Sequence, residues 1–159
     1  MRQIPEGSTG GVPAGLAGLR RDGLRLPWAL LAAVAGGVAL VAAFPPVGFW
    51  PLAAAGPALL VIALHRQGLR GSFLIGLVFG IAFFVPLLSW LVNVAWYAWA
   101  ALAIAEAVIF GVLAVGQRLL LRLPGWPLAV GGWWVAAEAM RAHLEANYRH
   151  LSENADAAD

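Results

Sequence analysis

The sequence contains no cysteine, and all ten of its basic residues are arginines, so lysine is absent as well. Without cysteine the chain has no disulfide, no thiolate metal site and no cysteine nucleophile. Without lysine it has no side-chain amine for nucleophilic catalysis or for a Schiff base. Charge of either sign is also scarce, because only 11% of the residues are charged. These absences exclude enzyme classes that would need a thiol or a side-chain amine from these 159 residues.

Apolar residues dominate what is present. They make up 62% of the sequence, well above the roughly 45–50% apolar content of soluble domains. A soluble protein of this length could not hide so much apolar surface, so the surrounding solvent must be lipid. The arginines are spread between apolar runs, which argues against a nucleic-acid partner. We therefore predict an all-α integral membrane protein, a bundle of about five transmembrane helices.

Proline, glycine and arginine divide the chain into apolar runs. Residues 1–26 are rich in glycine and proline and predict a disordered cytoplasmic arm. Arg20 and Arg21 would also suit a signal peptide, but an uncleaved first span is favoured because further spans follow directly. Residues 27–142 predict a membrane domain, and residues 143–159 a polar, acidic tail. The predicted spans are about 26–44, 49–64, 73–92, 96–116 and 126–141.

The positions of the arginines predict the orientation of the chain. Arginine occurs in the N-terminal arm and in the turns at 65–71 and 117–125, whereas the turns at 45–48 and 93–95 have none. Basic residues are enriched in cytoplasmic loops of membrane proteins. We therefore expect a multi-pass protein of the bacterial cytoplasmic (inner) membrane with its N-terminus in the cytoplasm and its C-terminal tail outside.

A few polar residues inside or beside the spans are candidates for function. Glu106 falls near the middle of the fourth span, where a carboxylate is costly and often functional. It could handle protons, ions or a polar substrate, or it could be a neutral residue bonded to Ser89 or Asn93. Glu138 and Arg141 are three residues apart and share a helix face. They predict an interfacial ion pair or an anchor for a lipid headgroup or a neighbouring domain.

Other groupings give weaker signals. His143, Asn147 and His150 have helical spacing, but no third strong ligand accompanies them, so we predict no metal site and no cofactor. Gly76 and Gly80 are four residues apart, a spacing that favours close helix packing over a partner code. The sequence has no phosphate-binding loop and no serine–histidine–aspartate grouping, so no catalytic residue is assigned.

Three stretches, taken together and in order, resemble the membrane region of apolipoprotein N-acyltransferases. The first is the proline-rich hairpin at 44–52, the second is the Gly-Phe-rich run at 76–84 followed by Ser-Trp-Leu, and the third is Trp-x-x-x-Glu-x-x-Arg at 134–141. The resemblance covers about residues 28–142. The positions that match are Phe44, Pro45, Pro46, Trp50, Pro51, Gly76, Gly80, Trp90, Trp134, Glu138 and Arg141.

The resemblance implies a specific chemistry. Members of that family are bacterial inner-membrane enzymes that move an acyl chain from a phospholipid to the N-terminal cysteine of a lipoprotein. They do so with a Glu-Lys-Cys triad in a nitrilase-like domain. This sequence stops after the fifth predicted span and has neither cysteine nor lysine. The resemblance therefore implies a truncated or split membrane domain, inactive alone, whose partners are membrane phospholipid and a separate catalytic domain.

Two other functions suit the same residues. One is a non-catalytic anchor or scaffold for a glycosyltransferase, in particular a polyprenol-phosphate mannosyltransferase. The other is a small transporter or channel that uses Glu106.

Overall fold

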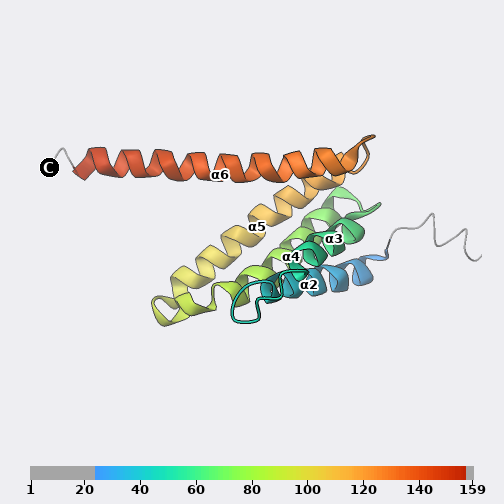
Figure 1. Cartoon of the computed structure of the whole chain (residues 1–159), viewed down its shortest axis with the longest axis horizontal. Coiled ribbons are helices and arrows are strands. Elements are labelled where there is room, and N and C mark those ends of the chain that lie inside the picture. The colour runs from blue at the N-terminus through green and yellow to red at the C-terminus, as the bar shows by residue number, and fades with distance from the viewer. Residues whose placement is uncertain (1–23, 157–159) are drawn as a thin grey trace, which may run out of the picture.

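The structure, a computed structural model, describes the backbone of residues 24–156 and the side chains of that stretch except at 144–145 and 148–156. Residues 1–23 of the predicted arm lie outside the described part. The prediction of an all-helical chain is confirmed for the described residues. Its helices are α2 (Leu26–Ala42), α3 (Leu52–Leu64), α4 (Leu69–Leu87), the short 3-10 helix η1 (Ser89–Asn93), α5 (Trp96–Leu120) and α6 (Trp126–Asp156), shown in Figure 1.

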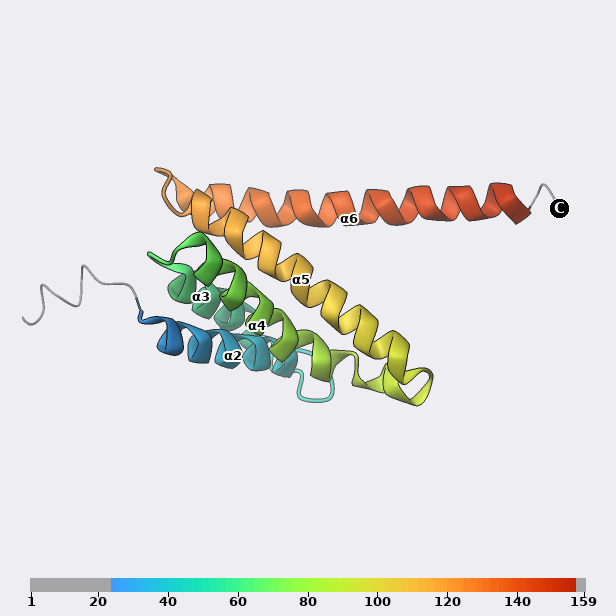
Figure 2. The same cartoon turned by 180° about the vertical axis from the view of Figure 1, so that it is seen from behind.

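The helices form one bundle with a divergent last helix. Helix α2 packs against α3 and α4, and α5 packs along α4 on the other side (Figures 1 and 2). Helix α6 starts beside the end of α5 and then runs away from it, so its C-terminal half extends beyond the bundle. The first helices are therefore packed around α4, whereas α5 and α6 diverge from each other.

Two helices, α4 and α5, are long and apolar enough to cross a membrane, and α2 and α3 are shorter apolar helices. At about 1.5 Å per residue, α4 reaches about 28 Å and α5 about 37 Å, against a hydrocarbon core about 30 Å thick. Helix α3 has 13 residues, so it covers only about 20 Å.

The hairpin between α2 and α3 takes its shape from its prolines and from Gly48. Gly48 has a φ of 65°, in the left-handed region that favours glycine. The amide of Gly48 donates to the carbonyl of Phe44 at 2.9 Å, and the amide of Phe49 donates to that of Ala42 at 3.1 Å. These bonds close the nine-residue connection between Ala42 and Leu52.

Helix α4 differs from the predicted span at both ends. It begins at Leu69 because Gly68, in an extended conformation, is its N-cap, and the hydroxyl of Ser72 donates to the Gly68 carbonyl at 3.0 Å. It ends at Leu87, one residue after Pro86. Proline lacks the amide that would continue the ladder, so the residues expected in the same span form η1 instead.

Helices α5 and α6 run further than their predicted spans. Helix α5 continues through Gln117 to Leu120, part of the stretch that we expected to be a basic turn. Helix α6 continues from the expected end of the fifth span at residue 141 to Asp156. No glycine or proline follows Gly132 in the sequence, and without a breaker the helix has no reason to stop at residue 141. The predicted tail is thus helical at 143–156.

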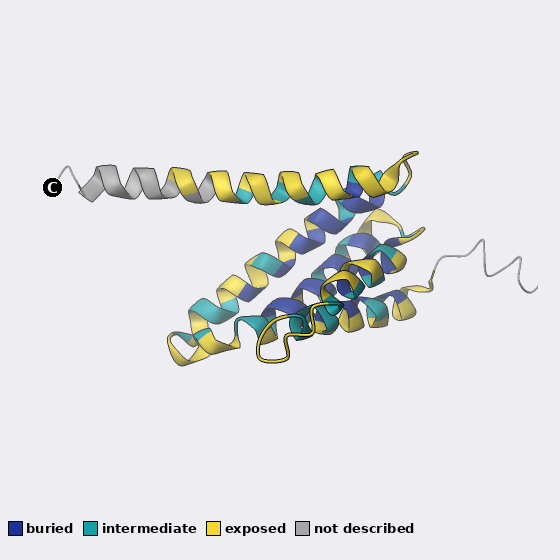
Figure 3. Cartoon of the chain, viewed as in Figure 1, coloured by how far each residue is buried: buried dark blue, intermediate teal, exposed yellow. Residues whose placement is uncertain are grey.

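Buried residues of α4 and α5 gather where the helices pack together (Figure 3), and glycines lie at the contacts between these two helices. A Cβ added at Gly80 would lie 2.8 Å from the Cα of Ala107 on α5, and one at Gly76 would lie 2.5 Å from the carbonyl oxygen of Phe110. The two glycines therefore bring α4 and α5 into backbone contact, the packing that small residues allow between membrane helices.

Candidate functional site

A chain of aromatic rings links the first hairpin to the last helix. Phe44 of the hairpin meets Phe83 of α4 with ring centroids 6.0 Å apart, and Phe83 meets Phe84 edge-on at 4.8 Å. Phe84 meets Phe110 of α5 at 5.1 Å, and Phe110 meets Trp134 of α6 at 5.3 Å. Such ring pairs add to stability beyond the area they bury. They join segments from all three sequence motifs.

A cavity of about 240 Å³ opens beside this chain. Its walls are apolar except at one side, where two charged residues of α6 lie. It is lined by Phe44, Phe83, Phe84, Phe110, Leu113, Trp134, Ala137, Glu138 and Arg141; we call it the motif pocket. The pocket is smaller than the roughly 300–1,000 Å³ typical of sites for drug-sized molecules, so it suits a slender apolar group better than a whole lipid.

Two tryptophans fix the angle at which α6 leaves α5. The indole Nε1 of Trp134 donates to Oε1 of Gln117 at 3.0 Å, and Gln117 is only 1% exposed. The indole Nε1 of Trp133 donates to the carbonyl of Leu113 at 3.0 Å. Because a buried polar group costs free energy unless it is bonded, these bonds hold α6 in a set orientation.

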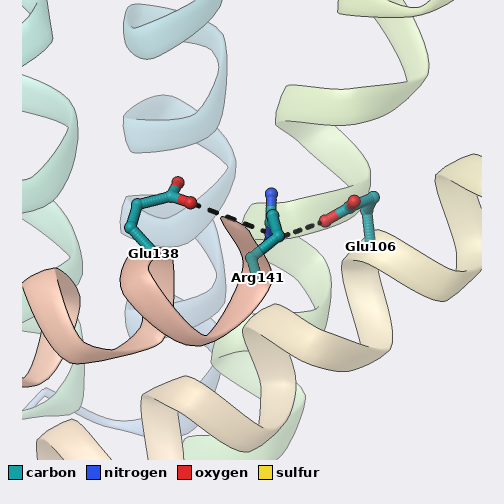
Figure 4. A network of polar contacts seen from close by, with 3 residues as sticks. All are labelled: Glu106, Glu138 and Arg141. Carbon is teal, nitrogen blue, oxygen red and sulfur yellow. Dashed lines mark hydrogen bonds and ion pairs between the residues drawn. The ribbon is translucent and has the colours of Figure 1, made fainter. Parts of the chain in front are cut away.

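An ion pair between α5 and α6 lies at the polar side of the motif pocket (Figure 4). The terminal nitrogen Nη2 of Arg141 donates to Oε2 of Glu106 at 3.0 Å, while its Nε lies 3.9 Å from Oε2 of Glu138. The side chains of Arg141, Glu106 and Glu138 are 35%, 18% and 72% exposed. The half-buried contact with Glu106 is therefore the strong one, and Glu138 is a peripheral neighbour.

This geometry differs from the sequence expectations for both carboxylates. Glu106 bonds to Arg141, and not to Ser89 or Asn93, which lie in η1. Arg141 reaches the level of Glu106 on α5 rather than pairing chiefly with Glu138. A partner 35 residues away cannot be found from helical spacing, which detects only neighbours three or four residues apart on one helix.

The arrangement suits binding more than reaction. Aromatic and aliphatic walls accept hydrocarbon, and the charged side can face a polar group attached to it. If all three side chains are ionised, Glu106, Glu138 and Arg141 together carry one net negative charge. No cysteine, lysine or serine is among the residues that line the pocket.

The motif positions fall into three groups in the structure. Phe44, Trp134, Glu138 and Arg141 line the motif pocket. Gly76 and Gly80 pack α4 against α5. The remaining matches lie in the two turns at one end of the bundle, with both tryptophans exposed: Pro45, Pro46, Trp50, Pro51 and Trp90.

Sequence reasoning missed several residues of the site. Five residues line the pocket although we assigned no individual role to them: Phe83, Phe84, Phe110, Leu113 and Ala137. One signal was present for Phe110, which follows Glu106 by four residues and so shares its helix face. A helix alone does not show which other helix that face meets.

The histidine grouping on α6 can be followed only in part. His143 and Asn147 are exposed on α6, and the side chain of His150 lies outside the described residues. Among the residues that the structure describes, no group of three or more histidine, aspartate or glutamate side chains is placed to hold a metal ion.

Comparisons with known proteins connect this site to a family. Residues 36–152 match the model described as the apolipoprotein N-acyltransferase N-terminal domain. Two relatives carry the name apolipoprotein N-acyltransferase. The one from Mycolicibacterium smegmatis is 46% identical over 102 residues, which cover 62% of this chain and 17% of that protein. The one from Vibrio cholerae is 42% identical over 60 residues, 38% of this chain and 12% of that protein.

The aligned segment is thus under a fifth of the length of either relative. No solved structure matches the chain. The matched range includes all three motifs, so the resemblance that they indicate is confirmed. The chain belongs to the apolipoprotein N-acyltransferase family, of which it carries the N-terminal domain.

Proposed function

We propose that this chain is the lipid-binding membrane domain of an acyltransferase of this family, and that the motif pocket holds an acyl chain of a membrane phospholipid. The observation that carries the proposal is the pocket itself. All three motif segments contribute to its lining or to the ring chain beside it, although they lie far apart in the sequence. A hydrocarbon wall with one charged side matches an amphipathic ligand.

Exposed aromatic residues at both ends of the bundle support insertion in a membrane. Trp28 and Trp126 are exposed near the starts of α2 and α6, at one end. At the other end, Trp50 is exposed before α3, Trp90 in η1 and Trp96 at the start of α5. Tryptophan is enriched at both interfaces of a bilayer. The helices between these ends would cross the inner membrane, with α6 as a fifth span whose polar half projects outward.

We propose that the acyl-transfer reaction itself depends on residues other than the 159 of this sequence. The 159 residues contain no cysteine or lysine, whereas a thioester mechanism needs a thiolate nucleophile. We propose that a nitrilase-like catalytic domain, in the same longer protein or in a partner chain, receives the lipid that this domain holds. The ion pair of Glu106 with Arg141 gives that glutamate a structural role, so transport through Glu106 is not favoured.

The proposed topology predicts the side on which the C-terminus lies. With the arginine-rich turns in the cytoplasm and five crossings, a reporter enzyme fused after Asp159 should report a periplasmic location. Matched fusions at Gln67 and Gly48 should report the cytoplasm and the periplasm. A cytoplasmic signal from the fusion after Asp159, with correct signals from the two controls, would contradict the fifth crossing.

Filling the motif pocket tests the lipid-binding role. Ala137 lines the pocket, whereas its neighbour Ala136 is exposed on α6 and does not. In membranes containing a phospholipid with a photoactivatable acyl chain, Ala137→Phe should lower labelling of the site about tenfold, the effect of about 1.4 kcal/mol in binding. Ala136→Phe is the matched control and should label like the parent chain.

The place of labelling decides the outcome. In the parent chain, peptide mapping should find the label on the pocket residues of α4, α5 and α6. Equal labelling of the Ala137→Phe and Ala136→Phe variants, or label scattered evenly over all lipid-facing helices, would contradict the proposal.

A further inference from the structure

Three segments of the chain are tied together at the end of the bundle opposite the hairpin. The side-chain amide of Gln67, in the α3–α4 turn, donates to the carbonyl of Leu24 at 2.7 Å. The carbonyl of the same Gln67 accepts a hydrogen bond from Nε of Arg118, on the last turn of α5, also at 2.7 Å. Gln67 therefore fixes the start of α2, the α3–α4 turn and the end of α5 as one unit.

Arg118 is held in this unit with its charged tip outward. The residue is only 9% exposed, and its hydrogen bond within the described part of the chain is made by Nε. In that part, no buried side-chain nitrogen or oxygen lacks a partner. The two terminal nitrogens of Arg118, which have no described partner, must therefore reach the surface. A guanidinium fixed through Nε presents two parallel donors, the geometry that binds a phosphate oxygen pair.

The charge around Arg118 is positive and uncompensated among the described residues. The positive charge of Arg122, one turn further along, acts on Arg118. Arg25, Arg66 and Arg70 lie in the segments that Gln67 joins or next to them. The ion pairs of the described residues all belong to Arg141 of α6, which reaches Glu106 near the middle of α5. Like charges held together repel each other unless an anion lies between them.

The position of this cluster along α5 identifies the kind of anion. Before Gly116, Glu106 is the one charged residue of α5, and Arg118 and Arg122 follow Gly116 within two turns. In a bilayer that position is the headgroup level, where basic residues between helices bind anionic lipid headgroups. The backbone at Arg66 has a φ of 62°, a left-handed conformation in which glycine would be less strained.

We propose that Arg118 and Arg122 form a binding site for the phosphate of an anionic phospholipid headgroup, at the membrane face opposite the proline-rich hairpin. The site is separate from the motif pocket. It rests on the proposed insertion in a membrane but not on the proposed acyl-chain binding. The two terminal nitrogens of Arg118 donate to oxygens of the phosphate, and Arg122 neutralises its remaining charge.

The experiment measures lipid retained by the purified full chain in native mass spectrometry. Delipidated protein is titrated with phosphatidylglycerol, with phosphatidylcholine and with inorganic phosphate. Phosphatidylglycerol should bind about tenfold more tightly than phosphatidylcholine, as a charge-assisted hydrogen-bonded contact would give. Inorganic phosphate should displace it only weakly. Equal binding of both lipids would overturn the proposal. If inorganic phosphate displaced the bound lipid as readily as added phosphatidylglycerol does, the assignment to a lipid would be overturned.

Matched variants separate a defined site from a general positive field. Arg122→Gln should lower the preference for phosphatidylglycerol over phosphatidylcholine about tenfold. Arg66→Gly removes one charge from the same end while relaxing the backbone, and should leave the preference nearly unchanged. Arg118→Lys keeps the charge but loses the fork, so it should weaken the preference as Arg122→Gln does. Equal losses in Arg122→Gln and Arg66→Gly, or full retention in Arg118→Lys, would overturn the site.

The same preparation shows whether a failure belongs to this proposal or to the membrane proposal. Alkaline extraction of cell membranes should leave the chain in the pellet. A chain that stays in the pellet but shows no lipid preference contradicts this site alone. A chain released into the supernatant contradicts the membrane insertion on which both proposals depend.

Discussion

Replacing Gly76 with leucine should separate α4 from α5 and destabilise the bundle more than any other single change that we expect. The added Cβ would lie against Ala114, 2.5 Å from the carbonyl oxygen of Phe110 and 3.0 Å from the Cα of Gly111. Two of these neighbours are backbone atoms, which cannot rotate away. Overpacking of a core usually costs about 1–3 kcal/mol. Because backbone atoms block this side chain, we expect the variant to lose about 3 kcal/mol or more.

The measurement is unfolding in detergent, followed by tryptophan fluorescence as temperature rises. Gly132→Leu is the matched control, because Gly132 also lies in a helix but has open space around it. That variant should unfold within a few degrees of the parent chain or slightly above it, since leucine favours helix over glycine. Equal midpoints for the Gly76 and Gly132 variants would show that α4 and α5 are not in close contact.

Removing the guanidinium of Arg141 should have the second-largest effect. Arg141→Met leaves Glu106, 18% exposed, without its partner on α6. Breaking a buried pair by removing one member costs about 3–5 kcal/mol. We expect a loss near the lower value, about 3 kcal/mol, because Arg141 itself remains one-third exposed. The loss should appear as a lower unfolding midpoint and as weaker packing of α6 on α5.

A double-mutant cycle tests whether the two residues are coupled. Glu106→Gln combined with Arg141→Met removes both charges, so the double variant should be more stable than Arg141→Met alone. Glu138→Gln provides the control, since its carboxylate is 72% exposed and 3.9 Å from Arg141, and exposed pairs contribute about 0–1 kcal/mol. Strictly additive losses for Glu106 and Arg141, or a loss for Glu138→Gln as large as for Arg141→Met, would contradict the pairing.

Much of the helical architecture could be predicted from sequence because helix breakers are local. Pro45, Pro46 and Gly48 end α2 through their own backbone geometry, and Pro86 stops α4 in the same way. Where breakers are lacking, the helices run beyond the predicted spans. Charge and polarity suggested that the helices end near residues 116 and 141, but those properties set membrane depth and leave the helix unbroken, so α5 and α6 continue.

The site was harder to predict than the helices for a different physical reason. The motif residues could be named from resemblance, but the cavity depends on how helices pack, and one sequence does not show that. Glu106 illustrates the limit. The free-energy cost of a carboxylate within an apolar run was evident from the sequence. Its partner Arg141, however, is on another helix, and the two meet because Trp134 and Gln117 set the angle of α6.

The ring chain from Phe44 to Trp134 has a consequence for how the protein is made. Phe44 leaves the ribosome early and Trp134 late, yet the two line the same cavity. While α6 is still being synthesised, Phe110 lacks the indole of Trp134 that it contacts in the finished protein. During biosynthesis the nascent chain therefore has an uncovered aromatic surface around Phe110, which becomes covered when the part of α6 that carries Trp134 packs against α5.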